Sequence, residues 1–409
     1  MPSPRRTSTL TALLALTVPG LALVAAGPTA PAGAAPLKCQ GKPVTIVATD
    51  DFSTLKGTDG PDVIHTAGRI FVNVLAGGGD DLVCTTVGDG SEIRGGAGDD
   101  TLVEKSQAAQ ERFWGRTFFF DDAGSDHVVA ARTSVLSYGD APAGVSIDAA
   151  GTVVASDDID TFEGRPRIQG SRFADHYVGT AGNDWYQSVL GPDPDQRFDN
   201  DVINTGAGDD FVRAYGGSVT LGRGDDRAHV VRATVTGGEG KDAITLTEGG
   251  SAAGGPGADR LDTTLSPFDE ERTFYRLSGG PGNDVLSPPA AARRADCPGS
   301  CARGSLEGGT GVDTLDLNWR DSVVDLAAGR LRVRGGVSEI GFFERVLGSH
   351  YDDVIRGDAR RNRFEGIRGA DVLVGRGGAD VLIGGRGRPD RAVGGAGRDR
   401  CDAEVRRSC

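Results

Sequence analysis

Histidine, methionine and aromatic residues are scarce in this sequence: its 409 residues include five histidines, one methionine and 6% aromatic residues. So few histidines leave little material for a histidine-rich metal site, and a single methionine excludes a methionine-lined binding surface. Positive charge is also in deficit, because 44 Lys and Arg face 58 Asp and Glu and the formal net charge is −14. Nucleic acid is therefore not an expected partner, since affinity for phosphates depends on an excess of cations.

Motifs of common enzyme classes are missing as well. There is no GxSxG, no HExxH and no CxxC, and the five histidines stand singly at positions 65, 127, 176, 229 and 350. We therefore expect no enzymatic activity. The acidic cluster Asp157, Asp158 and Asp160 with Glu163 leaves one alternative open, the paired carboxylates of a polysaccharide lyase or glycosidase. In a chain so rich in aspartate, we favour a degenerate turn as the explanation of this cluster.

Only the N-terminus contains a long hydrophobic run. Two arginines precede an apolar stretch, residues 10–26, which is followed by small residues. This pattern predicts a secretory signal peptide over residues 1–34, exported by either the Sec or the Tat pathway. The stretch of 17 residues is interrupted by a Pro-Gly pair and is shorter than the ~20 residues that span a bilayer. We expect a secreted, extracellular protein whose mature chain has no membrane span.

Six cysteines in an exported chain permit disulfides, and six cysteines allow 15 pairings among which the sequence does not choose. A structural zinc site is disfavoured, because four cysteines never cluster and no histidine lies near them. Spacing alone suggests three pairs: Cys39 with Cys84, Cys297 with Cys301 across a tight turn, and Cys401 with Cys409 at the C-terminal end.

Glycine, in contrast, is abundant: the chain has 64 glycines, more than twice the usual share of ~7%. No strict Gly-X-Y triplet is present, so a collagen-like structure is excluded. Many glycines belong to one short motif, G1-G2-x-G4-x-D6-x-U8, in which U is an apolar residue. Its better copies begin at Gly95, Gly237, Gly254, Gly279, Gly308 and Gly394. Such internal repetition is typical of a repeat protein.

The spacing of the D6 positions indicates the size of one coil. Near the C-terminus, D6 falls every nine residues, with one step of ten, from Asp353 to Asp399, so nine residues make half a coil. Earlier, D6 recurs every nineteen residues from Asp62 to Asp100, and each coil there keeps one motif turn. Short alternating apolar segments, such as residues 218–221, are interpreted as the return strands.

Each x-U8-x is interpreted as a short strand that points one apolar side chain inward, and glycines with positive φ reverse the chain between strands. The expected fold is all-β, a parallel β-roll or right-handed β-helix solenoid built from GGxGxDxUx nonapeptide repeats. Its stability would come from stacking of the coils, with the U8 residues in a continuous core. Expected core members are Ile64, Leu102, Ile244, Leu286, Leu373 and Leu382.

Stacked aspartates predict bound cations. Coils stack at ~4.8 Å, which brings the D6 carboxylates close enough to repel by on the order of 3 kcal/mol per pair at an effective dielectric constant near ~20. Carboxylates and backbone carbonyls are hard oxygen ligands, which suit several Ca²⁺ ions better than zinc or copper. The alternative is a set of Asp-Gly turns that bind no ion. The expected calcium ligands are Asp62, Asp81, Asp100, Asp184, Asp210, Asp226, Asp242, Asp259, Asp284, Asp313, Asp353, Asp371, Asp380, Asp390 and Asp399.

Each calcium site is expected between two stacked turns, with oxygens from both. The aspartates of such a pair must be about one coil apart in sequence. The favoured pairs are Asp62/Asp81, Asp81/Asp100, Asp210/Asp226, Asp226/Asp242, Asp242/Asp259, Asp353/Asp371, Asp371/Asp390 and Asp380/Asp399.

The repeats resemble those of hemolysin-type (RTX) calcium-binding repeat proteins, a secreted bacterial family with this nonapeptide. The resemblance covers roughly residues 57–402, with more than ten copies in register. It implies a parallel β-roll, calcium-dependent folding and an extracellular location. RTX toxins and lipases usually leave the cell through a type I apparatus that reads an uncleaved C-terminal signal. Because this chain has an N-terminal signal pattern instead, a toxin function is not expected.

Some turns depart from the family pattern. Phe173 and Tyr351 stand at G4, Asn362 stands at D6, and Pro389 adds a residue before Asp390. We expect weak or absent calcium binding in these turns.

The departures and repeats divide the chain. We expect a lead-in or cap over residues 35–56, a first RTX-like region with a degenerate middle over 57–286, a surface loop over 287–304, and a second RTX-like region with a C-terminal cap over 305–409. Residues 133–186 and 312–364 also look duplicated, because each contains a Phe-Glu pair followed by a Gly-Ser turn.

The C-terminal residues 356–409 reverse the overall charge, with 13 arginines against 8 acidic residues. We interpret them as solvated arginines that pair with neighbouring turns, and the alternative is a patch for cell-wall or extracellular polysaccharide. The sequence as a whole predicts a secreted calcium-binding repeat protein that serves as a structural or adhesive extracellular module. The alternative function is a carbohydrate-active β-helix enzyme of the polysaccharide lyase or epimerase type.

Overall fold

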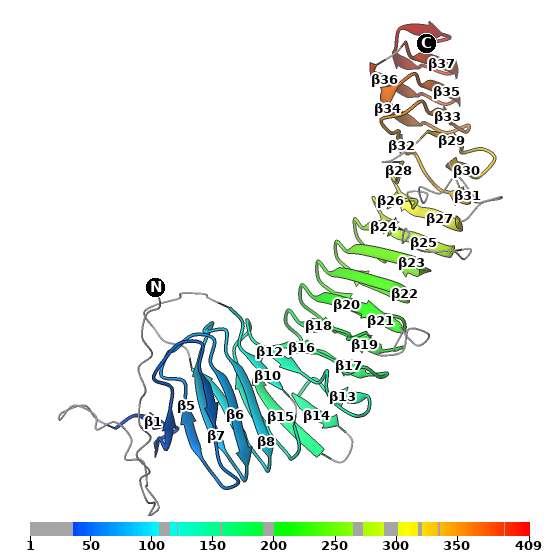
Figure 1. Ribbon diagram of the computed structural model, residues 1–409. Coiled ribbons are helices and arrows are strands. Elements are labelled where there is room, and N and C mark those ends of the chain that lie inside the picture. The colour runs from blue at the N-terminus through cyan, green and yellow to red at the C-terminus, as the bar shows by residue number, and fades with distance from the viewer. Residues whose placement is uncertain are drawn as a thin grey trace, which may run out of the picture. The chain divides into compact units, whose positions relative to one another are not determined.

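A computed structural model describes residues 36–105, 115–120, 122–155, 158–190, 200–264, 273–289, 302–317, 321–333, 336–387 and 389–409. The predicted signal peptide, residues 1–34, lies outside these residues. Every helix or strand assigned to the described residues is a β-strand (Figure 1). These residues therefore contain no helix with the length and apolar character needed to cross a membrane. Residues Lys38–Cys409 form one compact unit.

The strands of the N-terminal third are β1 (Lys38–Cys39), β2 (Lys42–Pro43), β3 (Ile46–Val47), β4 (Thr54–Lys56), β5 (Val63–His65), β6 (Asn73–Gly78), β7 (Leu82–Thr86), β8 (Glu92–Ala97), β9 (Thr101–Lys105), β10 (Phe118–Phe120), β11 (His127–Ala130) and β12 (Val135–Ser137). The central strands are β13 (Val145–Ile147), β14 (Thr152–Ala155), β15 (Asp158–Gly164), β16 (Arg167–Gln169), β17 (His176–Val178), β18 (Trp185–Gln187), β19 (Val202–Asn204), β20 (Phe211–Tyr215), β21 (Ser218–Arg223), β22 (Arg227–Glu239), β23 (Ala243–Ala253), β24 (Arg260–Thr264), β25 (Thr273–Gly282) and β26 (Val285–Ser287). The last strands are β27 (Ala302–Gly311), β28 (Thr314–Asp316), β29 (Ser322–Asp325), β30 (Arg330–Val333), β31 (Gly336–Gly341), β32 (Arg345–Leu347), β33 (Val354–Arg356), β34 (Arg363–Gly369), β35 (Val372–Gly377), β36 (Val381–Gly387), β37 (Arg391–Ala396), β38 (Arg400–Asp402) and β39 (Val405–Arg407).

Most strands pair in parallel with the equivalent strand of the next coil. In the row β5, β7, β9 and β11, the residues Ile64, Val83, Leu102 and Val128 lie opposite one another. A second row, β4, β6, β8, β10 and β12, is built from the same coils. Near the C-terminus, β33, β35, β37 and β39 alternate in the same way with β32, β34, β36 and β38. This pairing confirms the all-β parallel β-roll and the half-coil of nine residues.

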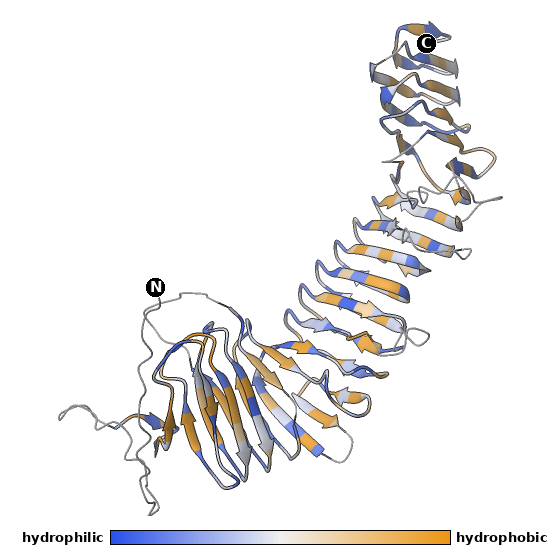
Figure 2. Cartoon of the chain, in the orientation of Figure 1, coloured by the Kyte–Doolittle hydropathy of each residue, from blue (hydrophilic) through white to orange (hydrophobic). Residues whose placement is uncertain are grey.

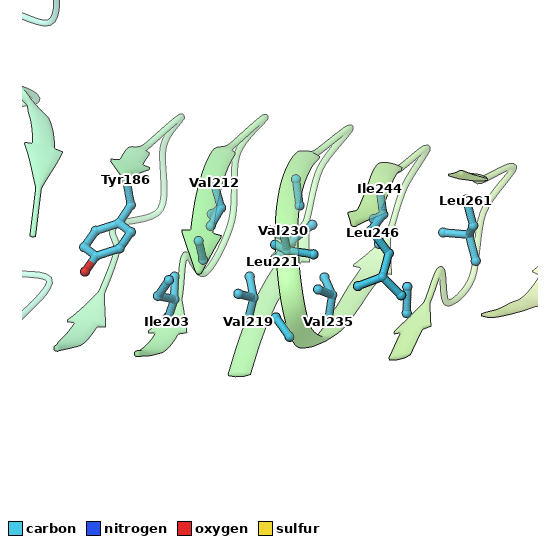
Figure 3. Close-up of a cluster of buried hydrophobic side chains, with 14 of the residues drawn as sticks. Tyr186, Ile203, Val212, Val219, Leu221, Val230, Val235, Ile244, Leu246 and Leu261 are labelled. Atoms are coloured by element: carbon cyan, nitrogen blue, oxygen red, sulfur yellow. The ribbon is translucent and has the colours of Figure 1, made fainter. Parts of the chain in front are cut away.

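One apolar side chain from each short strand builds the core. Hydrophobic and hydrophilic residues alternate along the strands (Figure 2), so one side of each strand faces inward. Figure 3 shows Ile203, Val219 and Val235 stacked along one row of strands, with Ile244 and Leu261 in the other. A buried side chain of this size contributes about 1.5–3 kcal/mol, but only when the next coil covers it. The predicted core residues Ile64, Leu102, Ile244, Leu286, Leu373 and Leu382 are each at most 1% exposed, so the prediction is confirmed.

Two antiparallel insertions accompany the parallel rows. Strands β13, β14 and β15 form one, and β29, β30 and β31 form the other. They lie in the two segments that the sequence shows as duplicated, residues 133–186 and 312–364.

The segment predicted as a surface loop, residues 287–304, lies between strands that belong to the stack of coils. Strand β26 ends at Ser287 and β27 begins at Ala302, and both take part in parallel pairing with their neighbours in the stack. The central part of this segment, residues 290–301, lies outside the described residues. Strand β25 of the first predicted repeat region thus pairs directly with β27 of the second.

Disulfides close both ends of the described chain. Cys39 in β1 is bonded to Cys84 in β7, and Cys401 in β38 is bonded to Cys409. Two of the three suggested pairings are thus confirmed, whereas Cys297 and Cys301 lie outside the described residues. None of these four bonded cysteines is available to a zinc site.

Candidate metal centre: the aspartate turns

Six-residue turns of the form G1-G2-x-G4-x-D6 precede many core strands. In the turn 237–242, Gly238 at position 2 has a φ of +122°, a conformation that favours glycine. The Gly238 N–H donates to the Gly254 carbonyl of the next coil at 2.8 Å and is therefore not available to the aspartate of its own turn. A Cβ on Gly237 would overlap both Oδ2 of Asp242 and the Gly254 carbonyl oxygen, which explains the glycine at position 1.

The position-6 aspartates are hydrogen-bonded to one another from coil to coil. The backbone N–H of Asp226 donates to Oδ1 of Asp242 at 3.0 Å, and the N–H of Asp242 donates to Oδ1 of Asp259 at 2.9 Å. Each carboxylate therefore joins two coils through one of its oxygens. This bond links all eight pairs predicted from spacing: Asp62/Asp81, Asp81/Asp100, Asp210/Asp226, Asp226/Asp242, Asp242/Asp259, Asp353/Asp371, Asp371/Asp390 and Asp380/Asp399.

The aspartate rows are longer than the spacing predicts. Bonds of the same kind link Asp184 to Asp210, Asp259 to Asp284, and Asp284 to Asp313. Four aspartates that we did not predict as ligands also belong to rows: Asp126, Asp160, Asp175 and Asp201. They were missed because their neighbours are 26 or 34 residues away in sequence. The sequence did contain one sign of the Asp126 turn, because Gly124 stands at position 4 of that turn.

In eleven of these turns, the second carboxylate oxygen, Oδ2, is buried and has no hydrogen-bond partner. Buried polar atoms are nearly always paired, so a regular series of unpaired ones calls for an explanation such as an ion. In the turn 237–242, this oxygen lies beside a backbone carbonyl of the next coil. Carboxylate and carbonyl oxygens are the ligands that Ca²⁺ prefers, so these residues fit calcium. The eleven are Asp81, Asp100, Asp210, Asp226, Asp242, Asp259, Asp284, Asp313, Asp371, Asp380 and Asp399.

Burial raises the pKa of these carboxyl groups. It raises the pKa of Asp242 and Asp371 to about 7 and that of Asp259 to about 6, and the negative charge of row neighbours adds to the effect. The pKa of an aspartate in the unfolded chain is ~4. At pH values between this and the raised pKa values, the metal-free folded state therefore binds more protons than the unfolded state. Its stability therefore falls as the pH rises through this interval. At neutral pH, the ionised rows need positive charge beside them.

Side chains alone do not form a metal cage in the part of the chain that the structure describes. No group of three or more His, Cys, Asp or Glu side chains converges on one point there. Backbone carbonyls must therefore supply the remaining ligands of any ion at an aspartate turn.

Comparison with protein families identifies the repeat. The model of the RTX calcium-binding nonapeptide repeat matches four copies, at residues 91–103, 198–221 and 356–389. The chain contains RTX-type calcium-binding repeats. A comparison with curated proteins finds no match. The matched segments contain Asp100, Asp210, Asp371 and Asp380, and each of these has an unpaired Oδ2.

Three predicted ligands lie in RTX turns of a second kind, in which position 2 is serine or threonine. The Ser349 backbone N–H and hydroxyl donate to Oδ2 of Asp353 at 2.6 and 3.0 Å. Thr180 donates in the same way to Asp184 at 2.6 and 3.1 Å. Thr58 donates to Asp62 at 2.8 and 2.9 Å. In these RTX turns, Oδ2 is already paired.

Two further RTX turns depart from the pattern near the C-terminus. Oδ1 of Asn362 accepts the Asp358 N–H at 3.0 Å, and its amide nitrogen is buried without a partner. Oδ1 of Asp390 accepts the Asp371 N–H at 2.9 Å, but residue 388 of the Asp390 turn lies outside the described residues. Asp390 thus belongs to a row, and its role as a calcium ligand stays a prediction.

The acidic cluster considered for catalysis is part of the RTX scaffold. Asp160 is buried, and its Oδ1 accepts the N–H of Asp126 at 2.9 Å. Glu163 is exposed and lies 3.9 Å from the His127 ring nitrogen Nε2. Asp157 lies outside the described residues. Asp160 therefore serves as a coil-to-coil acceptor, as the degenerate-turn interpretation expects.

Proposed function

We propose that this RTX protein binds one Ca²⁺ ion at each turn with a buried, unpaired Oδ2 and that the bound ions hold its coils together. The proposal rests on the eleven buried carboxylate oxygens that have no hydrogen-bond partner. Bound calcium supplies the positive charge that the ionised rows lack. Each aspartate then uses Oδ2 for the ion and keeps Oδ1 in the hydrogen bond between coils.

Calcium counting tests this function. Protein would be dialysed to equilibrium against millimolar calcium, in the range at which extracellular modules bind, and the calcium inside and outside the dialysis bag compared by elemental mass spectrometry. We expect up to eleven ions per chain, the number of unpaired oxygens. A folded, calcium-free chain after this treatment would contradict the proposal.

We also propose that the protein is exported and works as a non-catalytic structural module outside the cell. The N-terminal signal pattern supports export. The disulfides Cys39–Cys84 and Cys401–Cys409 support it as well, because such bonds persist mainly in oxidising compartments.

A cationic cleft favours a second, adhesive function. A cavity of about 320 Å³ is lined by Arg132, Arg165 and Arg167 together with Trp185 and Phe211. The Trp185 and Phe211 rings are stacked, with centroids 5.6 Å apart, and Arg167 lies 5.1 Å from the Trp185 centroid. Arg165 and Arg132 interact electrostatically with Asp184, which lines the same cavity. The cleft therefore gathers three positive charges against two lining acids, in a chain whose net charge is −14.

The chemistry of this cleft suits an acidic polysaccharide. Guanidinium groups pair with carboxylates, and flat aromatic rings give a sugar ring an apolar surface to stack on. Asn183 also lines the cleft and offers an amide for sugar hydroxyls. A lyase or glycosidase would need a pair of free acids here. Of the two lining acids, Asp184 is engaged by its own turn and only Asp209 is exposed.

Affinity electrophoresis in hyaluronate, a polymer of acidic sugars, tests the adhesive function. We expect retardation by hyaluronate but not by neutral dextran, and about tenfold weaker binding in the double variant Arg165→Ala, Arg167→Ala. Arg386→Ala, which removes an exposed arginine elsewhere, should bind like the parent protein. Equal retardation by single-stranded DNA would indicate a general polyanion site instead, and shortening of the polymer would indicate an enzyme.

A further inference from the structure

The residue at position 2 separates two kinds of RTX turn in this chain. In all eleven turns with an unpaired Oδ2, position 2 has a φ between +73° and +122°. Nine of these residues are glycine, and the other two, Ile367 and Arg376, adopt the same left-handed conformation. Thr58, Thr180 and Ser349 have no positive φ. The backbone conformation at position 2 therefore correlates with the pairing of Oδ2: it is left-handed where this oxygen is unpaired.

The conformation decides where the position-2 N–H points. In the turn 237–242, it donates to the carbonyl of the next coil and leaves Oδ2 of Asp242 without a donor. In the turn 348–353, the Ser349 N–H and hydroxyl both donate to Oδ2 of Asp353. Two local donors thus stand where the first kind of turn has an unpaired oxygen. They offset the negative charge and the desolvation of the carboxylate, as a cation would.

The turns of the second kind also share a place in the fold. Asp62 precedes Asp81, Asp184 precedes Asp210, and Asp353 precedes Asp371 in their rows. None of the three accepts the N–H of another described aspartate. The donors to Oδ1 are Thr45 for Asp62, Thr180 for Asp184 and Ser322 for Asp353. Three rows of unpaired aspartates therefore start on a turn whose carboxylate is paired locally. The row of Asp380 and Asp399 starts instead on Asn362, whose Oδ1 accepts the N–H of Asp358 in its own turn.

We infer that the turns of Asp62, Asp184 and Asp353 hold their shape without a cation and that each serves as the metal-free first turn on which calcium-binding turns stack. The residue at position 2 selects between the two states: serine or threonine supplies internal donors, whereas a left-handed residue leaves the oxygen for calcium. This inference rests on the proposed calcium function and removes three of the fifteen expected ligands from the binding sites.

Exchange of the position-2 residues in the full chain tests the inference. Thr180→Gly removes the hydroxyl and allows the left-handed conformation, so we expect one more calcium ion per chain and a folded protein in calcium. Gly238→Ser supplies donors to Asp242 and should lose one ion. Thr220→Gly, at an exposed strand position, controls for the flexibility that any new glycine adds and should leave the ion count unchanged.

The outcomes separate this inference from the calcium function itself. If the parent protein binds no calcium, the proposed function fails before the variants are compared. If the parent binds calcium and Thr180→Gly leaves the count unchanged, the assignment of the first turns is overturned. Failure of Thr180→Gly to fold even in millimolar calcium would also overturn it, because the ion should replace the lost donors.

Discussion

Removal of calcium with EDTA is expected to convert the far-ultraviolet circular dichroism of this protein from a β-rich to a coil-like spectrum, and millimolar calcium should restore it. The reason is that the rows bring buried carboxylates together at successive coils, and their raised pKa values show that ionisation at neutral pH is unfavourable there. Because each coil is stable only when stacked on its neighbours, loss of ions along a row should unfold many coils together.

Mass action sets the size of this effect. One site at a free calcium concentration a hundredfold above its Kd stabilises the folded state by about 2.7 kcal/mol, and this protein has a series of such turns. Magnesium is the matched control, because it demands octahedral geometry and gives up water reluctantly, and should restore much less structure. A protein that keeps its β-rich spectrum after complete calcium removal would refute calcium-dependent folding.

Asp242→Ala is expected to give the largest loss among single substitutions of the rows. It removes Oδ2 as a ligand in the middle of the longest row and also takes away the acceptor of the Asp226 N–H. A buried donor without an acceptor costs about 1–3 kcal/mol before the loss of calcium is added. Denaturant unfolding in calcium should therefore show a clear fall in the free energy of unfolding, together with a lower ion count.

Two substitutions serve as controls for Asp242→Ala. Lys241→Ala changes the exposed neighbouring side chain and should alter the free energy of unfolding by no more than about 0.5 kcal/mol. Asp62→Ala removes an aspartate whose Oδ2 is paired with Thr58, so it should lower stability without changing the ion count. Equal ion losses for Asp62→Ala and Asp242→Ala would contradict the assignment of the sites.

The regular parts of this protein were predictable from its sequence because they depend on local spacing. Aspartates one coil apart were expected to stack, and the hydrogen bonds from Asp226 to Asp242 and from Asp242 to Asp259 confirm this. Asp175 and Asp201 were missed as row members, since the 26 residues that separate them exceed the regular length of a coil. Asp62 and Asp353 had good spacing, but spacing does not reveal the donors that pair their oxygens.

By itself, the sequence determined the repeat, the β-roll, the apolar core and the stacking of aspartates, because a nine-residue period repeats the same backbone geometry in every coil. Only the tertiary structure decided which carboxylate oxygens remain unpaired, which turns begin a row and how arginines gather beside Trp185. These features depend on the direction of individual N–H groups and side chains, and on contacts across loops of irregular length. A periodic pattern specifies neither.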